Sequence, residues 1–220
     1  MAPARPVVLV TGATGQLGVD LTAALGAAGA TAVGAGSAGL DVTNRAVVSE
    51  AVAASGAEVV IHAGAWTAVD ACEADPDRAF AVNALGTRNV AEAAARAGAH
   101  VCYVSTDYVF DGTSPRAYTE WDRPNPTSVY GASKLAGEVE AGPGATVVRI
   151  SWVFSPRGQN MARTVLRLAG EHPTLRFVDD QTGSPTSTAD AAPAIVGLAL
   201  ERRPGVFHLT NQGTTTWFGF

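Results

Sequence analysis

The sequence predicts an α/β fold: a Rossmann-like doubly wound parallel sheet with a smaller, truncated C-terminal substrate domain. Short β-branched runs alternate with helical stretches as far as residue 150, which is typical of a parallel sheet with helices on both faces. A glycine turn joins the first expected strand to the first expected helix. Beyond residue 150 the alternation loosens. We therefore expect one domain over 1–150 and a partial second region over 151–220 that is interleaved with the first.

The first half of the chain supplies four expected strands and three expected helices. Residues 7–10 are apolar on both faces, as in a buried parallel strand, and Gly29 and Gly56 stand where the first two helices should end. Pro76 and Gly98 bound a long alanine-rich helix. The strands are expected at 7–10, 31–33, 58–62 and 100–105, and the helices at 15–28, 44–54 and 76–97.

The second half begins with a polar, proline-rich loop, expected over 111–126. A helix that carries Tyr130 and Lys134 follows it, and the β-branched run 146–150 predicts the next strand. Weaker patterns complete the chain. They predict helices over 160–169 and 190–200 and strands over 176–178 and 206–209.

The composition favours a folded protein that acts on small molecules. The 220 residues are 47% hydrophobic, enough for a sizeable core, and the net charge is −5. Nucleic acid and anionic membranes both attract proteins with a basic surface, and this net charge is negative. Neither is therefore an expected partner. Cys72 and Cys102 fit neither a disulfide framework nor a metal motif, and no other motif requires a metal. Because no signal peptide or membrane-spanning run is visible, we expect a cytoplasmic location.

The segment Gly12-Ala13-Thr14-Gly15-Gln16-Leu17-Gly18 predicts a dinucleotide site. Gly12 and Gly15 allow a tight strand-to-helix turn close to a pyrophosphate, and Gly18 lets the helix pack against the strand. Gln16 and Leu17 belong to the start of the helix, where free N–H groups and the helix dipole attract phosphate. The spacing is G-x-x-G-x-x-G, not the usual G-x-G-x-x-G. Its place between a strand and a helix supports the prediction.

The sequence leaves the choice between NADPH and NADH open. A NAD site usually has an acidic residue at the end of the second strand. Here that place is Gly34-Ala35-Gly36-Ser37, with neither an acid nor an arginine, which leans toward tolerance of a 2′-phosphate. Asp41 and Val42 come slightly later and could meet the adenine. Asp41 could also cap the helix that follows.

Tyr130 and Lys134 lie four residues apart and therefore share one helix face. The pKa of a free phenol is about 10, and a nearby ammonium lowers it toward the range useful for proton exchange. The pair predicts acid–base chemistry at a carbonyl, beside a nicotinamide cofactor. Ser105 and Thr106 end the preceding strand, where ligands bind in such sheets. Each hydroxyl could bind the substrate carbonyl or simply cap a turn.

Together with further segments, these motifs resemble the extended short-chain dehydrogenase/reductases, and within them the dTDP-4-dehydrorhamnose reductase family. The similarity implies NADPH- or NADH-dependent reduction of the 4-keto group of dTDP-4-dehydro-L-rhamnose to dTDP-L-rhamnose. A small-molecule sugar nucleotide is then the expected partner. Residues 1–150 would form the dinucleotide-binding domain, and residues 151–220 would form part of the sugar-nucleotide region. Because some relatives form homodimers, a homodimer is also possible. The segments that carry the resemblance are the glycine turn, 67–73, 105–110, 130–138, 151–154, 180–186 and 213–217.

The resemblance also implies roles for individual residues. Tyr130 would donate the proton to the forming alkoxide, Lys134 would tune Tyr130 and hold the nicotinamide ribose, and Thr106 would hydrogen-bond the sugar oxygen. Trp152 would form a pocket wall, although its type is also common in cores and interfaces. The other expected pocket residues are Asp107 and Tyr108 along the sugar, and Ala63, Gly64, Ala65, Thr67 and Val69 along the cofactor.

Two other functions stay open. The first is a sugar-nucleotide epimerase or dehydratase of the same fold. A dehydratase often needs a glutamate beside the Thr106-Asp107 pair, and Tyr108 does not supply one. The second is a non-catalytic, dinucleotide-binding regulatory subunit, which has no need of the Tyr130–Lys134 pair.

Two departures from the family pattern bear on the structure. His62 stands where relatives often carry asparagine and could be a buried, hydrogen-bonded strand residue. Relatives continue past residue 217 with more helix. We therefore expect Trp217, Phe218 and Phe220 to be left uncovered.

Overall fold

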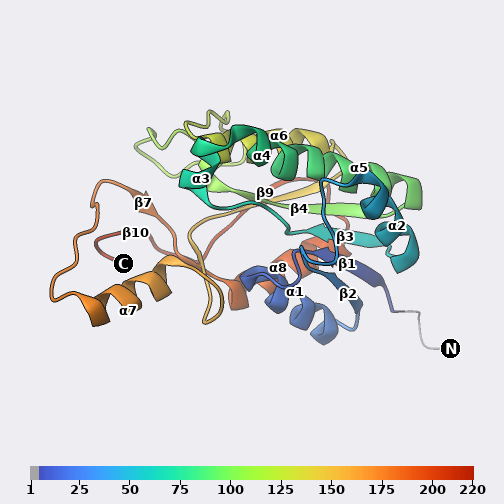
Figure 1. Ribbon diagram of the computed structural model, residues 1–220, viewed down its shortest axis with the longest axis horizontal. Coiled ribbons are helices and arrows are strands. Elements are labelled where there is room, and N and C mark those ends of the chain that lie inside the picture. Colours follow the sequence, from blue (N-terminus) through green and yellow to red (C-terminus); the bar gives the residue numbers. More distant parts are fainter. Residues whose placement is uncertain (1–4) are drawn as a thin grey trace.

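A six-stranded parallel sheet forms the centre of the structure, a computed structural model that describes residues 5–220 (Figure 1). The strand order is β2-β1-β3-β4-β5-β9, so the chain first builds to one side of β1 and then to the other. The point where the order reverses, between β1 and β3, is where such sheets bind ligands. The strands are β1 (Val7–Thr11), β2 (Thr31–Ala35), β3 (Val59–His62), β4 (His100–Thr106), β5 (Thr146–Ile150) and β9 (Gly205–Leu209).

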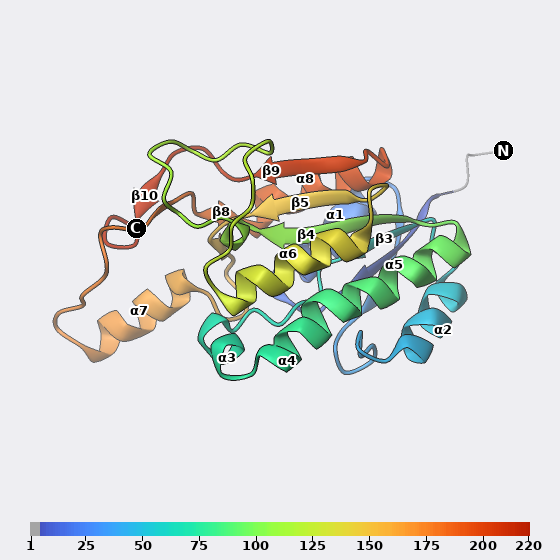
Figure 2. The same ribbon diagram turned by 90° about the horizontal axis from the view of Figure 1, so that it is seen from above.

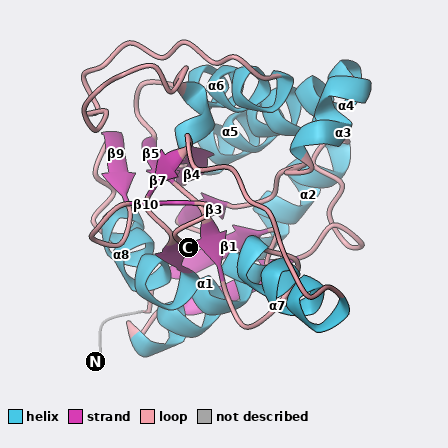
Figure 3. Ribbon diagram, turned by 90° about the vertical axis from the view of Figure 1, so that its left-hand side faces the viewer, coloured by secondary structure: helices cyan, strands magenta, loops and turns pink. Residues whose placement is uncertain are grey.

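Helices cover both faces of this sheet (Figures 2 and 3). Leu21 of α1 and Ile195 of α8 lie in the apolar layer on one face, and Val48 of α2 and Val90 of α5 lie in the layer on the other. Both layers form because the strands are apolar on both sides. The predicted doubly wound fold is confirmed. The main helices are α1 (Gln16–Ala27), α2 (Arg45–Ser55), α5 (Gly86–Ala97), α6 (Val129–Ala141) and α8 (Thr188–Leu200).

The segment predicted as one helix over 76–97 is helical throughout, but its hydrogen-bonding pattern changes along its length. It consists of α4 (Pro76–Phe80), a π-helical turn η1 (Ala81–Leu85) and then α5. A further short helix, α3 (Val69–Ala74), precedes it and was not predicted. Its Cys72 is buried against Tyr130, so a tertiary contact stabilises a segment too short to be recognised by its own pattern.

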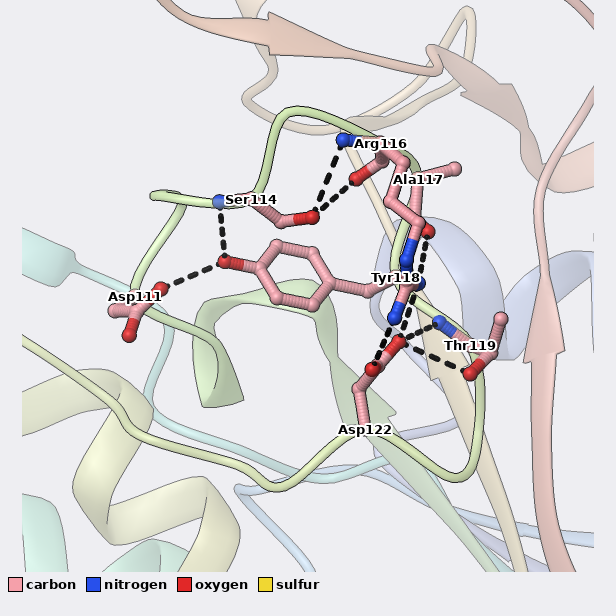
Figure 4. Close-up of polar contacts among 7 residues, drawn as sticks. All are labelled: Asp111, Ser114, Arg116, Ala117, Tyr118, Thr119 and Asp122. Atoms are coloured by element: carbon pink, nitrogen blue, oxygen red, sulfur yellow. Dashed lines mark hydrogen bonds and ion pairs between the residues drawn. The ribbon is translucent and has the colours of Figure 1, made fainter.

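The polar loop predicted over 111–126 is ordered by its own hydrogen bonds (Figure 4). It follows the short 3-10 turn η2 (Asp107–Val109). Asp111 accepts a hydrogen bond from the Tyr118 hydroxyl, and Asp122 accepts from Arg116 and Thr119. The ring of Tyr118 stacks on Phe110, with centroids 4.2 Å apart. The loop also contacts the edge strand β9, where the His208 N–H donates a hydrogen bond to Glu120 at 2.9 Å.

Residues 151–220 contribute to the main sheet and also form a smaller lobe. β9 lies at the sheet edge and α8 packs on α1, whereas α7 (Met161–Glu171) lies away from the sheet (Figure 1). The strand predicted over 176–178 is wrong: the Val178 carbonyl accepts a hydrogen bond from the Phe218 N–H, but no ladder forms over this segment. Short two-residue ladders occur instead between β6 (Val153–Phe154) and β8 (Thr186–Ser187), and between β7 (Thr182–Gly183) and β10 (Thr215–Thr216).

The aromatic side chains near residue 220 and the thiol of Cys102 differ in exposure. Phe218 and Phe220 are exposed, as expected, but Trp217 is half-buried. Cys102 is fully buried in the core, and burial raises the pKa of its thiol to about 12. Over residues 5–220, no helix has the length and apolar character needed to cross a membrane.

Candidate active site

A cavity of about 520 Å³ opens at the carboxyl ends of β1, β3, β4 and β5. Segments that are far apart in the sequence meet there, as the switch-point rule predicts. Most of the residues predicted for the site lie in its lining. They are Gly12, Gly15, Gln16, Leu17, Gly18, Ala63, Gly64, Ala65, Thr67, Val69, Thr106, Asp107, Tyr108, Tyr130, Lys134 and Trp152.

The glycine turn brings two backbone segments into close contact. Gly12 has a φ of 70°, and a Cβ built on it would lie 2.8 Å from the Cα of Gly64. A Cβ on Gly18 would meet the carbonyl oxygen of Gly12. Gly15 caps α1 without a side-chain hydrogen bond, and the first turn of α1 has no acidic residue. The free N–H groups of this turn therefore face the cavity as an anion site, which fits a dinucleotide pyrophosphate.

His62 supports this turn from behind. Its Nδ1 lies 2.6 Å from the hydroxyl of Thr11, and that hydroxyl accepts a hydrogen bond from the Gly64 N–H at 3.3 Å. Burial lowers the pKa of His62 to about 3, so the imidazole is neutral. The expectation of a buried, hydrogen-bonded strand residue is confirmed.

Asp41 and Val42 are not in the cavity lining. The Asp41 carboxylate accepts hydrogen bonds from the N–H and the hydroxyl of Thr43, which lowers its pKa. Asn44, not Asp41, caps α2, so that prediction was wrong: a carboxylate occupied by Thr43 cannot reach the helix N–H groups. The polar side chain of this region that does line the cavity is Ser37, which follows β2. The sequence showed it only as a serine in a place where an acid was missing.

Tyr130 is buried at the start of α6, where Ser128 caps the helix. Its ring meets Tyr108 edge-on, with centroids 5.5 Å apart. Burial raises the pKa of the phenol above its ordinary value, and a hydrogen bond with Thr106 opposes the shift. The lowered pKa expected from Lys134 is therefore not found. The phenol is protonated at neutral pH, as a proton donor must be.

The Lys134 ammonium is buried. It donates a hydrogen bond to the carbonyl oxygen of Val104 at 2.7 Å and lies 4.1 Å from the centre of the Tyr103 ring. Burial lowers its pKa to about 7, and the negative charge of Glu138 opposes this shift.

At the end of β4, the two neighbouring hydroxyls have different environments. Ser105 donates its hydrogen bond to Glu138 at 2.5 Å, so its hydroxyl is already engaged. The Thr106 hydroxyl donates to Asp107 and accepts from the Tyr108 N–H, both within the cavity lining. Burial raises the pKa of Asp107 to about 6. Both hydroxyls donate to a carboxylate, but Asp107 lines the cavity and Glu138 does not, so Thr106 is the better placed of the two to meet a ligand.

The far wall of the cavity is aromatic. Trp152 and Trp217 both line it, and their rings stack with centroids 3.6 Å apart. Trp152 has a φ of 44°, a left-handed conformation that is rare for a bulky residue and is often found at functional sites. Gly183 lies against the indole, where any Cβ would collide with the ring. Trp217 was not predicted to be part of the pocket.

Comparison with known proteins agrees with this geometry. The family model of the RmlD substrate binding domain matches residues 6–220. The chain belongs to this family. It is 42% identical to a dTDP-4-dehydrorhamnose reductase of Streptomyces griseus, over 97% of the chain and 73% of that protein. It is 38% identical to a dTDP-4-keto-6-deoxy-D-glucose reductase of Streptomyces niveus, over 96% of the chain and 74% of that protein.

A solved structure also resembles this RmlD family member closely. It is a dTDP-4-dehydrorhamnose reductase from Bacillus anthracis in complex with NADP, with a TM-score of 0.94 and 38% identity. The match covers 99% of the chain and 79% of that structure's chain. The chain thus spans about three quarters of the length of these relatives.

One structural residue of the RmlD site was missed from the sequence. Asn83, in the π-helical turn η1, hydrogen-bonds both the N–H and the carbonyl of Trp66, at 2.8 and 3.1 Å. It also donates to Ser133, which donates in turn to the Tyr130 carbonyl. Asn83 therefore ties the lining segment after β3 to the helix of Tyr130. Only the π-turn places it there, and residue spacing does not reveal such a turn.

Proposed function

We propose that the chain reduces the 4-keto group of dTDP-4-dehydro-L-rhamnose to dTDP-L-rhamnose, with a reduced nicotinamide cofactor. Family membership makes it an NAD(P)H-dependent sugar-nucleotide oxidoreductase of dTDP-rhamnose synthesis. The observation that carries the proposal is the shared cavity: the glycine turn, Thr106, Tyr130 and Lys134 all line it.

The cofactor would be held at the β1–α1 end of the cavity. The free N–H groups at Gln16 and Leu17 would meet its phosphates, because the glycines leave room for them. Ala63, Gly64, Ala65 and Thr67 would lie along it, and Lys134 would reach the nicotinamide ribose. Asp41 and Val42 are withdrawn from this set because they lie outside the lining. Ser37 takes their place near the adenosine.

The reduction divides the work between cofactor and protein. When bound, the reduced nicotinamide supplies a hydride to C4 of the sugar. The Thr106 hydroxyl, which donates to Asp107 in this structure, would rotate to donate a hydrogen bond to the carbonyl oxygen and so polarise it. Tyr130 gives its hydroxyl proton to the oxygen as the alkoxide forms, and the sugar alcohol results. The ammonium of Lys134 stabilises the phenolate left behind. Asp107, Tyr108 and Trp152 position the sugar.

One alternative substrate has support. The relative named dTDP-4-keto-6-deoxy-D-glucose reductase is 38% identical, and its substrate differs from dTDP-4-dehydro-L-rhamnose only in the sugar. Dehydration is less well supported, because Tyr108 follows Asp107 where a dehydratase often has a glutamate. An epimerase would keep its cofactor bound through turnover, whereas a reductase releases it each time. A purely regulatory role leaves the Thr106–Tyr130–Lys134 set without a purpose.

The proposal is tested by mixing the chain with NADPH or NADH and enzymatically prepared dTDP-4-dehydro-L-rhamnose. We expect the nicotinamide absorbance to fall and dTDP-L-rhamnose to form. The variant Tyr130→Phe should lose about 10²–10⁴-fold in kcat while its affinity for the cofactor, measured by fluorescence titration, is unchanged. Turnover of dTDP-4-keto-6-deoxy-D-glucose alone would support the second substrate. If the cofactor does not bind at all, the proposal is wrong.

A further inference from the structure

Glu138 and Arg149 form a buried ion pair behind the cavity. Their side chains are only 8% and 5% exposed. Two parallel hydrogen bonds join them, from the Arg149 Nε at 2.8 Å and from its Nη2 at 2.6 Å. The Ser105 hydroxyl donates a third hydrogen bond to the same carboxylate. The pair is therefore fully engaged, and it fixes α6 to both β4 and β5.

The helix of Tyr130 and Lys134 carries this carboxylate one turn further along, because positions 130, 134 and 138 share one face of α6. Lys134 is itself 2% exposed. Its ammonium hydrogen-bonds a neutral carbonyl, and within residues 5–220 it forms no ion pair. A buried charge without a partner is costly. The ammonium therefore depends on negative charge that lies nearby without touching it.

Few of the ionisable groups around Lys134 can supply this negative charge. On β3 and β4 it faces the neutral His62 and the buried phenol of Tyr103. On η2, the negative charge of Asp107 raises the pKa of Tyr130. Glu138 is the charged group that opposes the effect of burial on Lys134, and Arg149, on β5, is hydrogen-bonded to its carboxylate. Lys134 and Glu138 also contact neighbouring residues of β4, because the ammonium bonds the Val104 carbonyl and the carboxylate bonds the Ser105 hydroxyl. The carboxylate is thus held close to the ammonium, one helical turn away on the same face of α6.

We infer that Glu138, fixed by Arg149 and Ser105, is a positioning residue for the reaction: its buried carboxylate stabilises the charged form of Lys134. Lys134 must be charged to stabilise the Tyr130 phenolate and to bind the cofactor ribose, and burial alone works against this. Arg149 and Ser105 hold the carboxylate so that it does not collapse onto Lys134 as a direct ion pair, which would withdraw the ammonium from the cavity. The kinetic part of this inference rests on the proposed function, but the charge of Lys134 does not.

The sequence offers an unusually direct measurement. Lys134 is the single lysine of the sequence. Protein grown with ¹³C-lysine therefore gives one side-chain Cε resonance, and its chemical shift against pH reports the titration of Lys134 without substrate or cofactor. In Glu138→Gln we expect the midpoint of this titration to fall by about one pH unit. In a kinetic assay, the alkaline limb of the kcat/KM profile should move to lower pH by the same amount.

A matched control lies two residues along the same helix. Glu140 pairs with Arg88 at 2.7 and 2.5 Å on the exposed side of α6. Glu140→Gln removes the same charge and should leave the Lys134 midpoint unchanged. Should Glu138→Gln fail to fold, the double variant Glu138→Gln/Arg149→Met removes both buried charges, and its midpoint should still be lower than that of the wild type.

The outcomes separate the inference from the proposed function. An unchanged Lys134 midpoint in Glu138→Gln, or an equal shift in Glu140→Gln, overturns the inference even if the reduction is observed. A lowered midpoint with no turnover of the dTDP-sugar supports the inference while contradicting the proposed substrate. If Glu138 were only a structural brace, its variant would unfold at lower temperature but Lys134 would titrate as before.

Discussion

The indole rings of Trp152 and Trp217 stack face to face, with centroids 3.6 Å apart and an angle of 7° between their planes. Trp152 follows β5 of the main sheet, whereas Trp217 directly follows β10. The stack therefore joins the carboxyl edge of the main sheet to the small lobe formed by β7 and β10. The Ser151 hydroxyl, which donates to the Ser184 carbonyl at 2.7 Å, strengthens the same junction. The end of the cavity that Trp152 lines thus takes its shape from the lobe.

We expect Trp217→Ala to weaken sugar binding without affecting the cofactor. Removing the indole takes away the support of Trp152 and costs about 1–2 kcal/mol of stability, because the stack is half-buried. The KM for the dTDP-sugar should rise about tenfold, and the affinity for NADPH should stay the same. The excitonic couplet that two stacked indoles give in circular dichroism should disappear. Phe218→Ala, at a side chain that is 69% exposed, is the control and should change none of these.

The close contact between Gly12 and Gly64 predicts that Gly12→Ala impairs both cofactor binding and stability. Gly12→Ala must place a Cβ 2.8 Å from the Gly64 backbone and must also hold a φ of 70°. The two segments would separate, so we expect loss of measurable cofactor binding and a loss of about 1–3 kcal/mol in the free energy of unfolding. Isothermal titration with NADPH and chemical denaturation would measure both.

Gly26→Ala provides the matched control within the same element. A Cβ at Gly26, near the end of α1, would meet nothing within 4 Å. We expect the helix to gain about 0.5–1 kcal/mol of stability, with unchanged cofactor affinity. If Gly12→Ala bound NADPH as well as Gly26→Ala does, the close approach of the two loops would have no part in the cofactor site.

Local patterns were sufficient to predict the main sheet and most of its helices. Residues such as Val8 and Leu9 are apolar on both faces of β1, and glycines end α2 and α5, so strand type and helix ends are encoded within a few residues. For the same reason the glycine turn and the Tyr130–Lys134 pair were found. Each depends on spacing inside one segment.

Contacts between distant segments explain what the sequence did not reveal. The π-turn at Asn83 depends on a hydrogen bond with Trp66, and the half-buried position of Trp217 depends on Trp152. The segment 176–178 has a composition suitable for a strand, but its backbone contact with Phe218 does not extend into a ladder. The engagement of Ser105 by Glu138 joins β4 to α6, so nothing near Ser105 in the sequence distinguishes it from Thr106.

Asp107 and Asp111 should respond to pH with opposite signs. Burial raises the pKa of Asp107 from 3.8 to about 6, so its ionisation costs the folded state stability as pH rises between these values. Asp107→Asn should therefore be more stable than the wild type by about 1–2 kcal/mol at about pH 8, and no more stable at about pH 4. Turnover of the dTDP-sugar should nevertheless fall, because Asp107 lines the cavity.

Asp111 gives the reverse case. Hydrogen bonds from Tyr118, Asn125 and Thr113 lower its pKa well below 3.8 (Figure 4 shows the first of these). The carboxylate contributes stability at neutral pH, and this contribution is lost as pH falls below the ordinary value. Asp111→Asn should be less stable than the wild type at neutral pH, with a difference that shrinks in acid. Denaturant titrations of both variants at several pH values measure the signs, and equal signs would contradict the assignment.

The last prediction concerns the choice of cofactor. Ser37 lines the cavity after β2, where no acid is present to bind the ribose hydroxyls of NADH. An aspartate there would accept those hydrogen bonds and would repel a 2′-phosphate. We expect Ser37→Asp to lower the ratio of kcat/KM for NADPH to that for NADH by about tenfold or more. Ala38→Asp adds the same charge at a neighbour outside the lining and should change the ratio much less, whereas Asp41→Asn should leave it unchanged. Equal effects of the two new aspartates would mean that long-range charge, and not contact at Ser37, decides between the cofactors.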